Sequence, residues 1–159
     1  MVTRTPRLAL AVLVAITVVL AGGAVASGST RKPKINASVK VDTAKLGKLG
    51  QVLVTGTGHV LYMFQLDKHT KVACNSECQS IWLPLVAPST GVAKAVGLAR
   101  QSMISSDRNR YDGKRIVTYN GWPLYTYVND GGPDVDSGQS ILLNGGYWWV
   151  IRADGKPER

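Results

Sequence analysis

Two short motifs contain the side chains whose types and spacing could do chemistry together, and both have the form Tyr-x-aromatic-x-x-Asp. Their residues are Tyr62, Phe64 and Asp67 in the first motif and Tyr125, Tyr127 and Asp130 in the second. If each motif begins in a β-strand, its two rings lie two residues apart and face the same side of that strand. The aspartate then follows where the strand ends, and its carboxylate can accept hydrogen bonds from the backbone N–H groups of a turn.

A buried tyrosine hydroxyl needs a hydrogen-bond partner, and the aspartate of the other motif could supply one if pseudo-symmetry relates the two motifs. We therefore predict that both motifs are structural. The alternative is that the two tyrosine–aspartate sets converge and bind one ligand or cation.

The chain contains two cysteines, Cys74 and Cys78. In an oxidising compartment a closely spaced pair predicts a disulfide, and because the loop that it closes is small, its stabilisation should be modest. Two alternatives stay open, a redox-active dithiol and a copper site in which His69 and Met63 join the two cysteines, since thiolate, thioether and imidazole ligands suit Cu(I). The leading expectation includes no cofactor.

Other polar residues give weaker signals. His59 lies three residues before Tyr62, and Trp122 lies three residues before Tyr125, so the two occupy equivalent positions beside the motifs. This equivalence favours a packing role for His59 at a hairpin. Three carboxylates, Asp130, Asp134 and Asp136, lie in a glycine-rich loop. They do not follow the EF-hand calcium pattern, so we expect a solvated turn. Because the sequence has no nucleophile elbow and no His-Glu-x-x-His motif, we do not expect an enzyme.

The two motifs belong to a longer internal repeat. Residues 54–67 can be laid on residues 117–130 without a gap, with six identities in fourteen positions. Such self-similarity indicates a duplicated supersecondary unit.

The sequence predicts that the elements containing the motifs are β-strands. Residues 51–57 and 60–66 predict one hairpin, and residues 115–119 and 124–129 predict another. Both faces of the strand at 60–66 are largely apolar, so we expect it inside the molecule. Pro84 makes residues 81–86 an edge strand or an extended arm, residues 92–100 suggest a short helix, and residues 147–152 suggest a last strand. The predicted fold is all-β, a small sandwich or barrel of two pseudo-symmetric hairpin repeats at about 51–86 and 102–152.

The first residues form a targeting segment. Arg4 and Arg7 precede an apolar run at residues 8–20, and Ala24-Val25-Ala26 is a cleavage signal, so residues 1–26 are predicted to be a signal peptide. Residues 27–48 are read as a basic linker, and residues 49–159 as a single β domain. If cleavage does not occur, residues 8–27 are long enough to anchor the chain in a membrane.

The positive charge of the mature chain is concentrated in residues 27–48. We interpret this segment as a solvated spacer, and the alternative is adhesion to anionic lipid or wall polymer. The remaining body is nearly neutral and has no basic groove with interleaved aromatic residues, so nucleic acid is not an expected partner.

With these motifs the chain resembles a bacterial family of secreted or lipid-anchored proteins, the secreted-repeat or predicted-lipoprotein family defined by the Tyr-x-(Phe/Trp/Tyr)-x-x-Asp motif. Cys74-x-x-x-Cys78 followed by Trp82 and Pro84 resembles the first half of the family pattern. The second half is represented by Asp112-Gly113 and residues 117–125, and the resemblance covers about residues 49–151. The family has no established function. Lipid anchoring is not expected here, because glycine stands where the lipidated cysteine of a lipobox would be.

The sequence therefore predicts a secreted or extracytoplasmic, non-enzymatic binding or interaction protein of the cell envelope, whose partner is an envelope protein or a wall polymer. The alternative is a periplasmic or secreted copper or redox protein that uses Cys74 and Cys78. Contact with a membrane is expected only through an uncleaved N-terminal segment.

Overall fold

The structure is a computed structural model that describes Met1, residues 34–67 and residues 71–159. Residues 2–26 of the signal peptide predicted at residues 1–26, the first part of the predicted linker and His69 lie outside these residues. Residues 34–159 belong to one compact unit.

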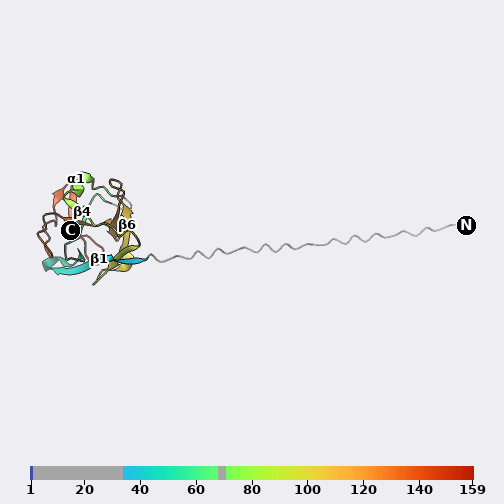
Figure 1. The fold of residues 1–159 in the computed structure, drawn as a ribbon, viewed down its shortest axis with the longest axis horizontal. Helices are drawn as coiled ribbons and strands as arrows, with labels where there is room; N and C mark the ends of the chain where they lie inside the picture. Colours follow the sequence, from blue (N-terminus) through green and yellow to red (C-terminus); the bar gives the residue numbers. More distant parts are fainter. Residues whose placement is uncertain (2–33, 68–70) are drawn as a thin grey trace. The chain divides into compact units, whose positions relative to one another are not determined.

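The described residues form an almost entirely β fold, which confirms the predicted fold class (Figure 1). The strands are β1 (Ile35–Leu46), β2 (Gly50–Thr55), β3 (Tyr62–Phe64), β4 (Trp82–Pro84), β5 (Val92–Ala95), β6 (Ile104–Arg108), β7 (Arg115–Tyr119), β8 (Trp122–Pro123), β9 (Tyr125–Tyr127), β10 (Leu142–Leu143) and β11 (Gly146–Val150). Three short helical segments accompany them, η1 (Gly47–Leu49), α1 (Ser76–Gln79) and η2 (Gln101–Met103). The sheets have the orders β2-β1-β5, β10-β11-β3-β9-β4 and β6-β7-β8.

The five-stranded sheet joins the two repeats by exchanging strands between them. At its centre β3 and β9 run antiparallel, with Tyr62 opposite Tyr125. The first repeat contributes β4, which pairs with β9 of the second, and the second repeat contributes β11, which pairs with β3 of the first. Because each repeat completes the sheet around the other, the two form one domain.

One face of this sheet carries a stack of four aromatic rings. The ring centroids are 4.4 Å apart for Phe64 and Trp148, 3.8 Å for Trp148 and Trp82, and 4.2 Å for Trp82 and Tyr127. Tyr62 meets Trp82 edge-on and Tyr125 meets Trp148 in the same way. Offset and edge-on ring pairs each contribute about 0.5–1.5 kcal/mol beyond the area that they bury. The stack is symmetric, since each repeat supplies equivalent rings.

Both faces of β3 are buried, as the apolar character of this strand predicted. Tyr62 and Phe64 belong to the cluster around the ring stack, whereas Met63 belongs to a second cluster with Leu61 and Leu124 on the other face. A strand buried on both sides is largely apolar throughout.

The two hairpins differ in length, which corrects the gapless alignment of the repeats. In the first, the N–H of Thr55 bonds to the carbonyl of His59, so residues 56–58 form the loop. In the second, Tyr119 lies opposite Trp122, and Asn120 and Gly121 form a two-residue turn with φ of 48° and 81°. The alignment therefore holds from residue 59 onward and is shifted by one residue before the turn.

The predicted linker at residues 27–48 is wrong for residues 35–46, which form β1. Val41 is fully buried, and β1 pairs with β2 from Val41 to Leu46 and with β5 on its other side. The segment reads as polar because lysines such as Lys40 and Lys45 are exposed while alternate residues reach the core. Val39, Val41 and Thr43 alternate with polar residues, and this alternation is a strand signal. The basic composition of the segment favoured a linker instead.

Two smaller expectations have opposite outcomes. The short helix expected in residues 92–100 is wrong, because Val92–Ala95 form β5, which runs parallel to β1. The edge strand predicted from Pro84 is confirmed, because β4 is the last strand of its sheet. Proline is tolerated there because an edge strand leaves one side of its backbone unpaired.

We predict that Val41→Ala lowers the free energy of unfolding by about 1–3 kcal/mol, because it removes two buried methyl groups from a strand that is part of the fold. The measurement is urea denaturation of the exported protein. Ser38→Ala, at an exposed position of the same strand, is the control and should change stability little. If Val41→Ala is as stable as the control, β1 does not contribute to the core.

Candidate functional site

The four polar groups of the repeated motifs form two hydrogen bonds, each between the repeats. The hydroxyl of Tyr62 donates to Oδ2 of Asp130 at 2.8 Å, and the hydroxyl of Tyr125 donates to Oδ2 of Asp67 at 2.7 Å. All four residues are buried. Each tyrosine thus bonds to the aspartate of the other repeat, and the exchange of strands is matched by an exchange of hydrogen bonds.

The two aspartates differ at their second oxygen. Oδ1 of Asp67 accepts from the backbone N–H groups of Ala73 at 2.6 Å and Cys74 at 3.3 Å. Oδ1 of Asp130 is buried and has no hydrogen-bond partner among the described residues. The backbone N–H groups of Ser137 and Gly138 favour the charged form of Asp130, although neither makes a well-formed bond to Oδ1. Asp67 is therefore fully used by the fold, and Asp130 is not.

Burial governs the titration of these groups. It raises the pKa of Asp67 to about 6, against the opposing effect of the Tyr125 hydroxyl and the two backbone donors. It also raises the pKa of Asp130, while the Tyr62 hydroxyl acts to lower it. The pKa values of Tyr62 and Tyr125 are raised by burial and by the neighbouring carboxylates, so both hydroxyls stay protonated and donate.

The predicted disulfide between Cys74 and Cys78 is present. It closes the loop that leads into α1, where the side chain of Asn75 accepts a hydrogen bond from the N–H of Cys78 at 2.9 Å. The N–H of Cys74 is one of the donors to Asp67. The disulfide loop therefore holds one of the two motif aspartates.

A metal site gains no support from this arrangement. The sulfur atoms of Cys74 and Cys78 are bonded to each other, Met63 is buried in the second hydrophobic cluster, and His69 lies outside the described residues. In residues 34–67 and 71–159, no three or more histidine, cysteine, aspartate or glutamate side chains gather where they could hold an ion. The described residues therefore lend support neither to the copper alternative nor to a cation site at the aspartates of the glycine-rich loop.

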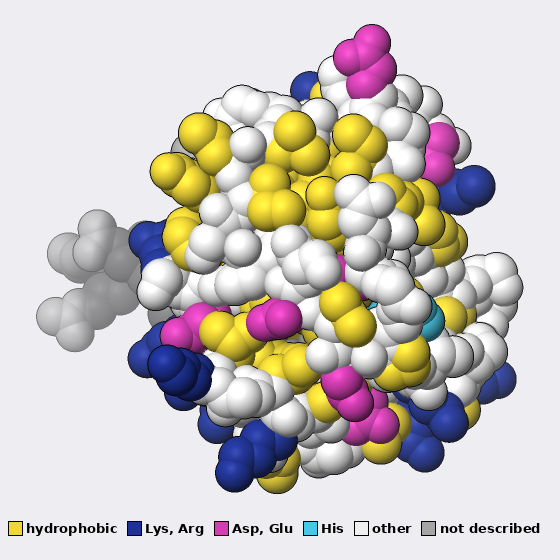
Figure 2. All heavy atoms as spheres, turned by 90° about the vertical axis from the view of Figure 1, so that its left-hand side faces the viewer, with side chains coloured by type: hydrophobic (Ala, Val, Ile, Leu, Met, Phe, Trp, Pro, Cys, Tyr) yellow, Lys and Arg dark blue, Asp and Glu magenta, His cyan; other side chains and the backbone are white. Residues whose placement is uncertain are grey.

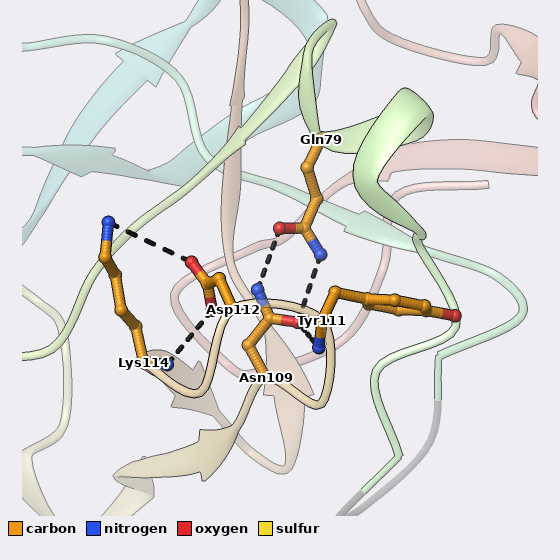
Figure 3. A network of polar contacts seen from close by, with 5 residues as sticks. All are labelled: Gln79, Asn109, Tyr111, Asp112 and Lys114. Atoms are coloured by element: carbon orange, nitrogen blue, oxygen red, sulfur yellow. Dashed lines mark hydrogen bonds and ion pairs between the residues drawn. The ribbon is translucent and has the colours of Figure 1, made fainter.

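An amide pair joins the disulfide loop to the hairpin between β6 and β7 (Figure 3). Nδ2 of Asn109 donates to Oε1 of Gln79 at 2.8 Å, and Nε2 of Gln79 donates to Oδ1 of Asn109 at 3.3 Å. Nε2 of Gln79 also donates to the carbonyl of Cys74 at 2.7 Å. Asn109 is fully buried, and Oδ1 accepts a further bond from the N–H of Tyr111. These contacts satisfy a buried polar side chain and fix the loop.

An open groove lies between the first hairpin and the β4–β9 pair, with a volume of about 390 Å³. Its lining combines hydroxyl, imidazole, carboxylate and aliphatic side chains: Thr55, Thr57, His59, Leu83, Pro84, Leu85, Thr126, Tyr127, Val128 and Asp130. Pockets of this size are large enough for a small ligand or a few residues of a peptide.

The equivalent position in the other repeat is occupied by larger side chains. There Trp122, which corresponds to His59, packs against the cluster that contains Met63. Trp149 lies opposite Met63 in the sheet, just as Leu83 lies opposite Thr126 in the groove. Replacing two tryptophans and a methionine by histidine, leucine and threonine removes side-chain volume at one of two equivalent positions. The groove is the space that results.

The walls of the groove offer both polar and apolar contacts. Oγ1 of Thr57 lies 2.9 Å from Oγ1 of Thr55 and 3.2 Å from Nδ1 of His59, which forms a chain of donors and acceptors. Leu83 and Val128 are 47% and 46% exposed beside it. Exposed apolar side chains also occur elsewhere, and Figure 2 shows them gathered on part of one face, with charged side chains around them.

The sequence brought out the motif residues but not the groove. The structure brings Tyr62, Asp130, Tyr125 and Asp67 together as expected for pseudo-symmetric repeats, and it places Phe64 and Tyr127 at the two ends of the ring stack. Residues such as Leu83, Thr126 and Thr57 have no motif of their own. The available signal was the pairing of His59 with Trp122, which shows that one repeat has lost a large side chain.

Comparison with known proteins gives one result. A family model described as a secreted repeat of unknown function matches residues 43–86 and 107–152, one segment for each repeat. No curated protein and no solved structure matches the chain. None of the helices formed by the described residues has the length and apolar character needed to cross a bilayer.

We predict a pH dependence of stability that Asp67→Asn reduces, because the substitution removes the contribution of Asp67 and leaves that of Asp130, whose pKa is also raised. Because burial raises the pKa of folded Asp67 from 3.8 to about 6, its contribution to stability is complete below pH 3.8 and is lost as the pH rises through about 6. From pH 4 to pH 7, wild type should lose on the order of 2 kcal/mol relative to Asp67→Asn. The measurement is urea denaturation of both proteins across this range, and parallel curves would contradict the prediction.

We predict that Cys74→Ala/Cys78→Ala lowers the free energy of unfolding by about 2 kcal/mol, the value for a loop of this length. Thiol labelling of the exported wild type, denatured without reductant, should detect no free thiol by mass spectrometry. Two labelled thiols per chain would show that the disulfide does not form in the native compartment.

Proposed function

The chain belongs to the family of secreted repeats of unknown function, and on that basis we propose that it is an extracytoplasmic, non-enzymatic binding protein of the cell envelope. The observation that supports this proposal is the groove beside His59, which one repeat has and the other has filled. A pseudo-symmetric fold does not need such a difference for its stability.

The interior follows the symmetry closely, whereas the groove departs from it. The ring stack consists of equivalent rings from the two repeats, the two tyrosine–aspartate bonds are equivalent, and Tyr62 lies opposite its counterpart Tyr125. Filling the groove, as Trp122 does in the second repeat, would bury more apolar surface and stabilise the protein. Leaving Leu83 and Val128 exposed beside polar groups instead costs stability, which a binding role explains.

The groove is built on rigid elements. Its floor belongs to the β4–β9 pair of the five-stranded sheet, and its rim belongs to a hairpin closed by backbone hydrogen bonds. A site whose side chains are held before binding loses little conformational entropy when a ligand arrives. We expect the ligand to be an envelope protein or a wall polymer.

The test is to fill the groove with the residues of the other repeat, in the variant His59→Trp/Thr126→Met. Ser105→Trp, at an exposed position of β6 outside the groove, is the matched control for an added tryptophan. The labelled mature protein is mixed with purified cell envelopes, and the bound fraction is measured by cosedimentation over a range of concentrations. Wild type and the control should bind saturably, and the filled variant should bind at least tenfold more weakly.

A melting curve of each variant establishes that it is folded. If the filled variant is folded and binds as tightly as wild type, or if wild type shows no saturable binding, the proposed function is wrong.

A further inference from the structure

The groove continues past the first hairpin. A second segment of about 410 Å³ is lined by Ser38, Val39, Lys40, Thr55, Gly56, Thr57, Leu85 and Val86. It shares Thr55, Thr57 and Leu85 with the segment beside His59. The two segments therefore adjoin at the hairpin hydroxyls, and we call the pair, which extends from Asp130 to Lys40, the elongated groove.

One end of this groove is acidic. Asp130 lines it, and the loop that follows packs on the tip of the first hairpin. There the N–H of Asp134 donates to the carbonyl of Gly58 at 3.2 Å. A Cβ atom on Gly58 would lie 2.9 Å from Pro133, so glycine is needed for this contact. Asp134 itself is exposed. The loop thus places the exposed residue Asp134 beside the hairpin tip at this end of the groove, whereas the unpaired Oδ1 of Asp130 is buried.

The other end is basic. The stem of Lys40 lies along the hairpin, where a Cβ atom on Gly56 would be 3.1 Å from its Cβ. In the β1–β5 pairing Lys40 is opposite Lys94, and both are exposed. Like charges at directly opposed positions of a sheet are destabilising. Neither lysine lies in an ion pair with the described carboxylates, so both charges are available to an anion.

Between the charged ends the exposed side chains are aliphatic. Leu83, Val86 and Val128 are 45–47% exposed, and Tyr127 already stacks on Trp82. Aliphatic side chains form shallow apolar contacts that suit the alternating side chains of an extended peptide, and the threonine hydroxyls offer donors and acceptors for its backbone.

We propose that the elongated groove binds one extended peptide segment of a partner protein, with a basic group at the Asp130 end and a carboxylate at the Lys40 end. This inference rests on the proposed function and names the ligand class of the same site.

The first experiment uses peptides as probes. Three fluorescent peptides share a Val-Thr-Val-Thr centre and carry at their two ends Lys and Glu, Glu and Glu, or Lys and Lys, with both termini blocked. Wild type should bind the peptide with Lys and Glu about fivefold more tightly than either of the others, as expected for partly exposed charge pairs.

Lys40→Glu should transfer this preference to the peptide with two lysines, whereas Lys156→Glu, a lysine outside the groove, should leave it unchanged. Equal binding of the three peptides, or a preference that Lys40→Glu does not alter, would overturn the inference.

The second experiment separates this inference from the proposed function. Envelopes are digested with a protease, washed and used in the same cosedimentation assay. Loss of saturable binding is expected for a peptide ligand. If binding persists and is still abolished by the filled variant, the groove binds a wall polymer, which overturns the peptide inference and leaves the proposed function intact. If undigested envelopes do not bind wild type, the proposed function itself fails.

Discussion

The fold depends on a buried exchange of hydrogen bonds between two tyrosines and two aspartates. A carboxylate or hydroxyl withdrawn from water without a partner destabilises a protein by several kcal/mol. Each tyrosine here finds its acceptor only in the other repeat, as Tyr62 does in Asp130. Neither repeat can therefore satisfy its own motif. The constraint joins the halves and keeps Tyr62 opposite Tyr125, and this register in turn lets Trp82 and Trp148 stack on each other at the centre of the domain.

Around this symmetric interior the two repeats have diverged, and the differences are of two kinds. The disulfide loop follows only the first motif, and its backbone supplies the remaining bonds of Asp67. The loop after Asp130 makes no well-formed bond to Oδ1 of that residue, and it packs on the tip of the first hairpin. The second difference is the loss of a large side chain at His59, which opens the groove. One difference stabilises the fold, and the other creates a surface that the fold does not require.

Together these features describe a repeat module whose buried interior follows the symmetry and whose groove departs from it. The ring stack and the motif bonds are largely buried, and Tyr127 and Asp130 are their members that also line the groove. The polar rim, the aliphatic walls and the opposite charges at its ends come from loops and strand edges, where substitution has little effect on the core.

The sequence alone determined the duplicated unit, the all-β class, the disulfide and the burial of both faces of β3, because these follow from local spacing, alternation and residue type. It also indicated that an aspartate of one repeat could supply the hydrogen-bond partner of a tyrosine in the other. It did not reveal β1, since lysines on the exposed positions hid the alternation around Val41, nor the one-residue difference between the hairpins. The strand exchange, the ring stack and the groove were decided only by the tertiary structure. Each depends on residues far apart in the chain, such as His59 and Thr126, and on the space between them, which no local pattern records.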